Sequence, residues 1–110
     1  MADRRSKICN YGSTQVIRPK FTLVEDGSYS KPDSMAVVLS KGATTVALWS
    51  AGVDDEIVEI KDSEDQYMYY QIYVDTTLFT EPCEGVVTIT ATYTGTPDQN
   101  VVAKARYTIL

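Results

Sequence analysis

Apolar and polar residues alternate along most of the chain with a period of two, the pattern of strands that bury one face. The alternation first becomes regular in residues 17–23, where the odd positions are apolar and the even ones polar. It returns in six further stretches that we expect to be strands, at residues 35–40, 44–49, 56–61, 67–75, 84–93 and 101–109. No long window has a helical period, so only a single helical turn is expected, around Leu78 and Phe79.

About seven short strands separated by frequent turns indicate an all-β sandwich of two packed antiparallel sheets. Pro19 cannot donate to a strand ladder, so the first of these strands is expected at a sheet edge or at a change of partner. In the later strands the alternation predicts that Val58 and Ile60, and then Val101 and Ala103, point inward. The predicted core consists of Phe21, Leu39, Trp49, Ile60, Ile72, Ile89 and Tyr107.

The chain has 110 residues, which is the size of one domain. Residues 1–13 show no alternation and are expected to form a flexible N-terminal arm without core positions. Residues 14–110 are then a single sandwich domain. No stretch approaches the roughly 20 apolar residues of a membrane-spanning helix, and the polar start does not resemble a secretory signal. We therefore expect synthesis in the cytoplasm and no membrane partner.

Charge is unevenly distributed along the sequence. The net charge is −5, yet residues 1–20 hold five basic residues against one acid, which leaves −9 for the remainder. Residues 54–65 alone contain seven acids against Lys61. Nucleic-acid affinity depends on contacts to phosphates, so an acidic body disfavours a nucleic-acid partner. Arg4, Arg5 and Lys7 in the basic arm are instead candidates for docking to a protein partner or to another copy.

The residue inventory disfavours catalysis. The chain has no histidine, which removes the most common general base and metal ligand. Cys9 and Cys83 have no visible activator, and two cysteines are too few for a disulfide framework, so we expect both to be reduced. The acids of residues 54–65 lack calcium-loop spacing and are expected to be a solvated loop. The sequence therefore predicts a protein that is not an enzyme and that has no cofactor and no metal.

Tyrosines mark one face of the strand at residues 67–75. The alternation places Met68, Tyr70, Ile72 and Val74 on one face, and Tyr67, Tyr69, Gln71 and Tyr73 on the other. Tyrosine is enriched at interfaces, because it offers a large contact area at a low entropy cost. The alternative is that these tyrosines cover a neighbouring strand by cross-strand pairing. Tyr67, Tyr69 and Tyr73 are the candidate partner-binding residues.

The last three strands carry a family resemblance. The segments Tyr70-Gln71-Ile72-Tyr73-Val74-Asp75, residues 84–93, and Ala103-Lys104-Ala105-Arg106-Tyr107-Thr108-Ile109 resemble the E, F and G strands of immunoglobulin-like domains. Cys83 precedes its strand and no second cysteine lies on the B-like strand, so the antibody subfamily is not supported. In overall style, with a polar arm and one Thr/Val-rich sandwich, the chain resembles the immunoglobulin-like virion proteins of tailed phages.

That resemblance implies a non-catalytic structural or accessory protein of the virion, located in capsid decoration or in the tail. Its expected partner is a capsid or tail protein, with self-association as a further expectation. The alternative function, from a different class, is a carbohydrate- or receptor-binding module that uses the face with Tyr67, Tyr69 and Tyr73. Fold alone does not decide between the two.

Overall fold

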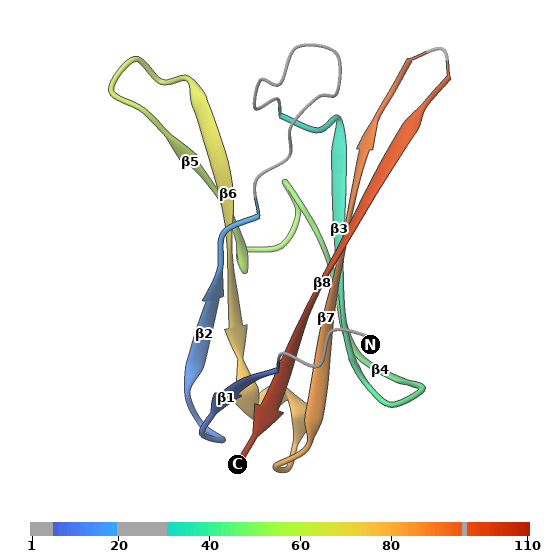
Figure 1. Cartoon of the computed structure of the whole chain (residues 1–110). Coiled ribbons are helices and arrows are strands. Elements are labelled where there is room, and N and C mark those ends of the chain that lie inside the picture. Colours follow the sequence, from blue (N-terminus) through green and yellow to red (C-terminus); the bar gives the residue numbers. More distant parts are fainter. Residues whose placement is uncertain (1–5, 20–30, 96) are drawn as a thin grey trace.

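The computed structural model describes residues 6–19, 31–95 and 97–110, and within them the chain forms two facing β-sheets (Figure 1). The described strands are β1 (Lys7–Cys9), β2 (Thr14–Ile17), β3 (Ser34–Lys41), β4 (Thr44–Ser50), β5 (Ile57–Lys61), β6 (Tyr67–Asp75), β7 (Glu84–Tyr93) and β8 (Gln99–Ile109). A short 3-10 helix, η1 (Thr76–Phe79), links β6 to β7. The predicted all-β architecture of two sheets is confirmed, and so is the single helical turn.

The two sheets differ in size. The larger has the order β1-β8-β7-β3-β4 and the smaller has the order β2-β6-β5. All neighbouring strands are antiparallel except β1, which pairs in parallel with the end of β8. The strand predicted at residues 17–23 begins earlier, as β2, and it ends at Ile17, just before Arg18 and Pro19. Strand β2 lies at the edge of its sheet and does not include Pro19, while residues 20–23 of the expected strand lie outside the described residues.

The core lies where the two sheets face each other. Strands β3 and β7 of the larger sheet contribute Val37, Leu39, Val87 and Ile89, all of which are almost completely buried. From the smaller sheet, Ile72 packs into the same cluster. Five of the seven predicted core residues are buried: Leu39, Trp49, Ile72, Ile89 and Tyr107. Phe21 lies outside the described residues.

The predicted orientation of β5 is wrong. Val58 and Ile60 pair with Gln71 and Tyr69 on the outer face of the smaller sheet, and Val58 is 36% exposed. Ile57 is the buried residue of this strand. Because residues 57, 58 and 60 are all apolar, the sequence is compatible with a strand that buries Ile57 or with one that buries Val58 and Ile60. Contact with the larger sheet selects the strand orientation that buries Ile57. A register shift between Ile60 and Lys61 then lets the strand end in the β5–β6 turn.

Residues 6–13 are part of the folded body, which differs from the expectation of an arm without core positions. Lys7–Cys9 form β1, and Cys9 is buried in the core. The backbone N–H of Leu110 donates to Cys9 O, and that of Tyr11 donates to Leu110 O, both at 2.8 Å. Buried Thr76 donates its hydroxyl to Ser13 O at 2.7 Å. A three-residue strand is too short to produce a recognisable period, so sequence alternation does not reveal it.

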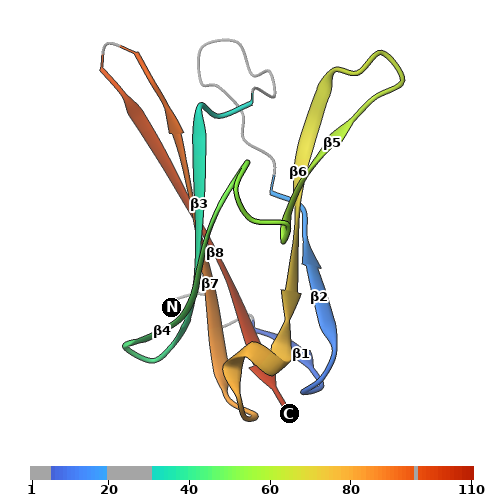
Figure 2. The same ribbon diagram turned by 180° about the vertical axis from the view of Figure 1, so that it is seen from behind.

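The sheets diverge toward the end of the molecule that carries the β5–β6 and β7–β8 turns, as both views show (Figures 1 and 2). Val101, which was predicted to point into the core, is 38% exposed there, and Ala103 is exposed as well. Farther along β8, Tyr107 and Ile109 are buried. The alternation of β8 is therefore regular, but only its second half meets the smaller sheet.

The opposite end is closed by η1. Phe79 is 1% exposed, and its ring packs against the backbone at Gly85 near the start of β7. A Cβ atom added at Gly85 would lie 2.9 Å from two carbon atoms of the Phe79 ring and 3.3 Å from Ile109. Glycine is required here because the ring occupies the space of a side chain.

We therefore expect Gly85→Ala to lower the free energy of unfolding by about 1–3 kcal/mol, which is the usual cost of overpacking a core. Gly95→Ala is the matched control, because its added Cβ would make only an ordinary contact, at 3.5 Å from Pro97 O. Urea unfolding of both variants measures the difference. Equal stability of the two variants would contradict the assigned role of Gly85.

Both cysteines are free, and they lie on opposite sides of Ile109. Cys9 is paired with Ile109 across the β1–β8 ladder, while Cys83 O accepts the Ile109 backbone N–H at 2.8 Å. Two strand spacings therefore separate the cysteines, roughly 9–10 Å, which is beyond the Cα–Cα reach of a disulfide.

We expect two titratable thiols in the protein unfolded without reductant, and no change in Tm when reductant is added. A fall in Tm on reduction, together with fewer than two thiols, would show that a bridge forms.

Candidate functional site

Two of the three candidate tyrosines lie together on the outer face of the smaller sheet. Tyr73 of β6 stands opposite Val16 of β2, and Tyr69 stands opposite Ile60 of β5. Val58 lies on the same face and is exposed. We call this surface the tyrosine face, made of Val16, Val58, Ile60, Tyr69 and Tyr73. No other element among the described residues forms a layer over it, and Val16, Val58 and Tyr73 are each exposed.

Polar groups fix the centre of the tyrosine face. Arg18 Nε donates to Gln71 Oε1 at 2.8 Å, and Gln71 Nε2 donates to the Tyr73 hydroxyl. Gln71 thus connects a cation from the β2 end to the phenol of Tyr73. Tyr73 is 37% exposed, so the ring combines an accessible edge with a held hydroxyl. This arrangement suits a contact surface, because less side-chain entropy is lost on binding when a ring is already positioned.

Tyr67 lies apart from the other two. Its ring makes an edge contact with Tyr70, with centroids 5.6 Å apart and planes at 60°. Burial raises the pKa of Tyr67 to about 12, with smaller contributions from neighbouring Tyr93 and Tyr70. Tyr70 is a buried core residue. Its contact with Tyr67 therefore supports the alternative that Tyr67 is a packing residue, at the end of the molecule where the two sheets diverge.

The basic candidates do not extend the tyrosine face. Arg4 and Arg5 lie outside the described residues. Lys7 is exposed on β1, which belongs to the larger sheet, whereas Tyr69 and Tyr73 belong to the smaller one. The cation that accompanies the tyrosines is Arg18. In the sequence Arg18 is only one of the five basic residues of positions 1–20, because its contact to Gln71 spans 53 positions.

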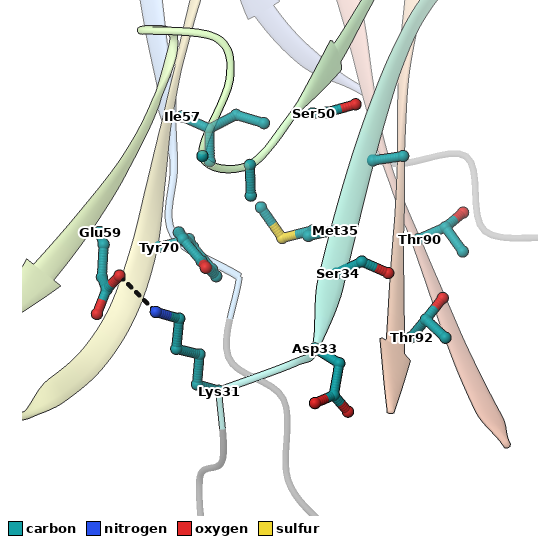
Figure 3. A pocket seen from close by; sticks show the side chains of 13 residues that line it. Lys31, Asp33, Ser34, Met35, Ser50, Ile57, Glu59, Tyr70, Thr90 and Thr92 are labelled. Atoms are coloured by element: carbon teal, nitrogen blue, oxygen red, sulfur yellow. Dashed lines mark hydrogen bonds and ion pairs between the residues drawn. The ribbon is translucent and has the colours of Figure 1, made fainter. Parts of the chain in front are cut away.

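A hollow of about 600 Å³ opens at the divergent end, beside β3 (Figure 3). Met35, Ile57 and Tyr70 form its apolar part, and Lys31 donates to Glu59 Oε1 across it at 2.8 Å. That hydrogen bond raises the pKa of Lys31. On the other side, the backbone N–H of Thr94 donates to Asp33 and lowers the pKa of its carboxyl. The charged groups of the hollow are therefore already paired, which suits structural closure more than catalysis.

The acids of the predicted solvated loop serve the turns of the backbone. Asp54 Oδ2 accepts the Ser50 N–H at 2.8 Å, and Asp62 Oδ1 accepts the N–H groups of Glu64 and Gln66 at 2.8 and 3.0 Å. Within the described ranges, no group of three or more His, Cys, Asp or Glu side chains is placed to hold a metal ion. In the same residues, no helix is long and apolar enough to cross a membrane.

No family model matches the chain, and no curated protein matches it.

The buried phenols predict how stability responds to alkaline pH. Burial raises the pKa of Tyr67 to about 12 and also raises the pKa values of Tyr70, Tyr93 and Tyr107. An unfolded tyrosine ionises near pH 10. The folded state therefore binds these protons more tightly, so their contribution is complete below about pH 10 and is lost as the pH rises toward 12.

We expect the free energy of unfolding to fall steadily above about pH 10. Tyr67→Phe should reduce the slope of that fall, because it removes the group whose pKa rises to about 12. Denaturant titrations at a series of pH values measure this slope. An unchanged slope in Tyr67→Phe would contradict the burial of the Tyr67 phenol.

Proposed function

We propose that this chain is an immunoglobulin-like sandwich that works by protein–protein binding and has no catalytic activity. The strand order supports the family-type fold. Strands β2, β6 and β5 take the places of the B, E and D strands, while β3, β7 and β8 take those of C, F and G. Strand β4 extends the second sheet next to β3, as an additional strand does in variable-type domains.

The tyrosine face is the observation that carries a binding function. It joins aliphatic side chains and two tyrosines with one arginine, and aromatic residues and arginine are enriched in the interfaces of protein complexes. Val16, Val58 and Tyr73 are each more than a third exposed. Covering this face with a partner removes apolar area from water at a gain of about 25 cal/mol per Å².

The setting we propose is a tailed-phage virion, where the chain is a capsid decoration protein or a tail component. This proposal rests on two features, the resemblance of a small Thr/Val-rich sandwich to such virion proteins and a surface suited to a protein partner. In a multi-copy particle, a weak individual contact is sufficient, because repeated attachment raises the overall avidity.

A carbohydrate-binding module is the second candidate, supported by the exposed edge of Tyr73. A sugar platform uses several aromatic rings on one surface, whereas Tyr67 packs against Tyr70 at the divergent end. Two tyrosines with aliphatic neighbours favour a protein partner over a glycan.

The proposal is tested first by the genes that neighbour the coding sequence, which we expect to encode capsid and tail proteins. The chain is then co-expressed with the neighbouring head or tail protein, and the affinity of the pair is measured. Tyr73→Lys should weaken binding at least tenfold, which corresponds to about 1.4 kcal/mol.

Val102→Lys is the matched control. Val102 is 58% exposed on the outer face of the larger sheet, and its substitution should leave the affinity unchanged. Equal weakening by both variants, or by neither, would remove the tyrosine face from the interface. Specific binding on a glycan array by the wild-type chain, abolished by Tyr73→Lys, would replace the proposal with the carbohydrate-binding function.

A further inference from the structure

The edge strands of the two sheets are protected to different degrees. Proteins keep sheet edges from pairing with other chains by shortness, by charged side chains or by proline. Among the described edges, β1 has three residues, β2 runs directly into Arg18 and Pro19, and β5 contains Glu59 and Lys61. The half of β8 that β1 leaves uncovered contains Lys104 and Arg106.

Strand β4 has none of these three protections, and its only irregularity among the described pairs is the register shift opposite Leu39 and Ser40 of β3. Its sequence Thr-Thr-Val-Ala-Leu-Trp-Ser has seven residues, no charge and no proline, and among the described strands it pairs only with β3 (Figure 2). Leu48, near its middle, is 64% exposed. An uncharged, β-branched edge of this length is the kind of strand that accepts another strand.

The β3–β4 ladder shows which backbone groups point outward. The N–H of Ala51 donates to Met35 O at 3.0 Å, so Ala51 is bonded to β3. Antiparallel ladders alternate, so Trp49 and Ala47 also bond to β3, whereas the N–H and C=O of Leu48 point away from it. The outward groups of Ser50 are already used, by Asp54 Oδ2 and by the N–H groups of Val53 and Asp54. The available edge is therefore the part of β4 before Ser50.

We propose that β4 pairs with β4 of a second copy of this chain, antiparallel about a two-fold axis, to form one continuous ten-stranded sheet. The charges at the two ends of the strand select this occupant. Lys41 is the last residue of β3 and pairs with Thr44, the first residue of β4, while the acids Asp54 and Asp55 lie in the turn that follows β4. An antiparallel copy brings Lys41 of each chain beside these acids of the other, while the uncharged strands meet in the middle.

Pairing through β4 produces a dimer and no larger assembly. A two-fold contact uses the same edge of both copies, so it leaves no second β4 edge for growth. The other described edges keep their charges, proline or shortness. Strand pairing over about 20 Å, six residues at roughly 3.4 Å each, makes a small interface, and small interfaces form weak and concentration-dependent complexes.

Sedimentation equilibrium of the wild-type chain over a wide concentration range should show a monomer–dimer equilibrium. Asp55→Lys should weaken the dimer severalfold, because it places two cations together at each end of the interface. Asp55→Lys combined with Lys41→Glu should restore it toward the wild-type constant. Lys41 is bonded to Glu81 of its own chain at 2.9 Å, so Lys41→Glu alone disturbs that pair. If Asp55→Lys acted only on the fold of one chain, adding Lys41→Glu would not restore the dimer.

Glu64→Lys is the control for the change in net charge, since Glu64 lies in the β5–β6 turn, far along the chain from β4. It should leave the dimer unchanged. A second test targets the backbone. Leu48→Pro removes an outward N–H and should abolish dimer formation while preserving the β-sheet circular dichroism spectrum, whereas Leu48→Thr should retain the dimer.

A wild-type chain that stays monomeric at the highest soluble concentration would overturn the proposal. So would a dimer that tolerates both Leu48→Pro and Asp55→Lys. The tyrosine face is untouched by these variants, so loss of the dimer with retained partner binding separates this inference from the proposed function.

Discussion

The contact between two sheets of unequal extent is the constraint on which the rest of the structure depends. The five-stranded sheet is larger than the three-stranded sheet that faces it, and they meet through β3, β7, β6 and the last residues of β8. Where they meet, Val37, Leu39, Ile72 and Ile89 are almost completely buried. Where they diverge, alternation continues without burial, as Val101 shows. The hollow beside β3 is a consequence of the same divergence.

The closed end is held by side chains that connect distant segments. Phe79 fills the space over Gly85, and Thr76 ties the 3-10 turn to residues 12 and 13 with two hydrogen bonds, of 2.9 and 2.7 Å. Through this turn β1 is fixed beside the end of β8, where Cys9 completes the core. The segment expected to be an arm is therefore part of the body from residue 6 to residue 13.

We propose two surfaces for partners, the outer face of the smaller sheet and one edge of the larger sheet. The smaller sheet presents Tyr73 and its aliphatic neighbours, with the Tyr73 hydroxyl held through Gln71 and Arg18. The larger sheet presents the uncharged edge of β4. These surfaces lie on different sheets and would bind through different interactions. The first offers side-chain area to a partner, and the second offers backbone hydrogen bonds to another strand.

The sequence by itself determined the class of the fold and most of its strands. A period of two over many residues specifies a strand whatever its neighbours are, and β6 begins and ends at the residues that the alternation predicted. It also determined that Tyr69 and Tyr73 share a face. Only the tertiary structure decided which faces are covered. Val58 and Ile60 point outward because Ile57 meets the other sheet, and Tyr67 turns to Tyr70 at the divergent end. Local alternation fixes which side chains lie together, whereas burial depends on a facing sheet whose extent is set by residues far away in the chain.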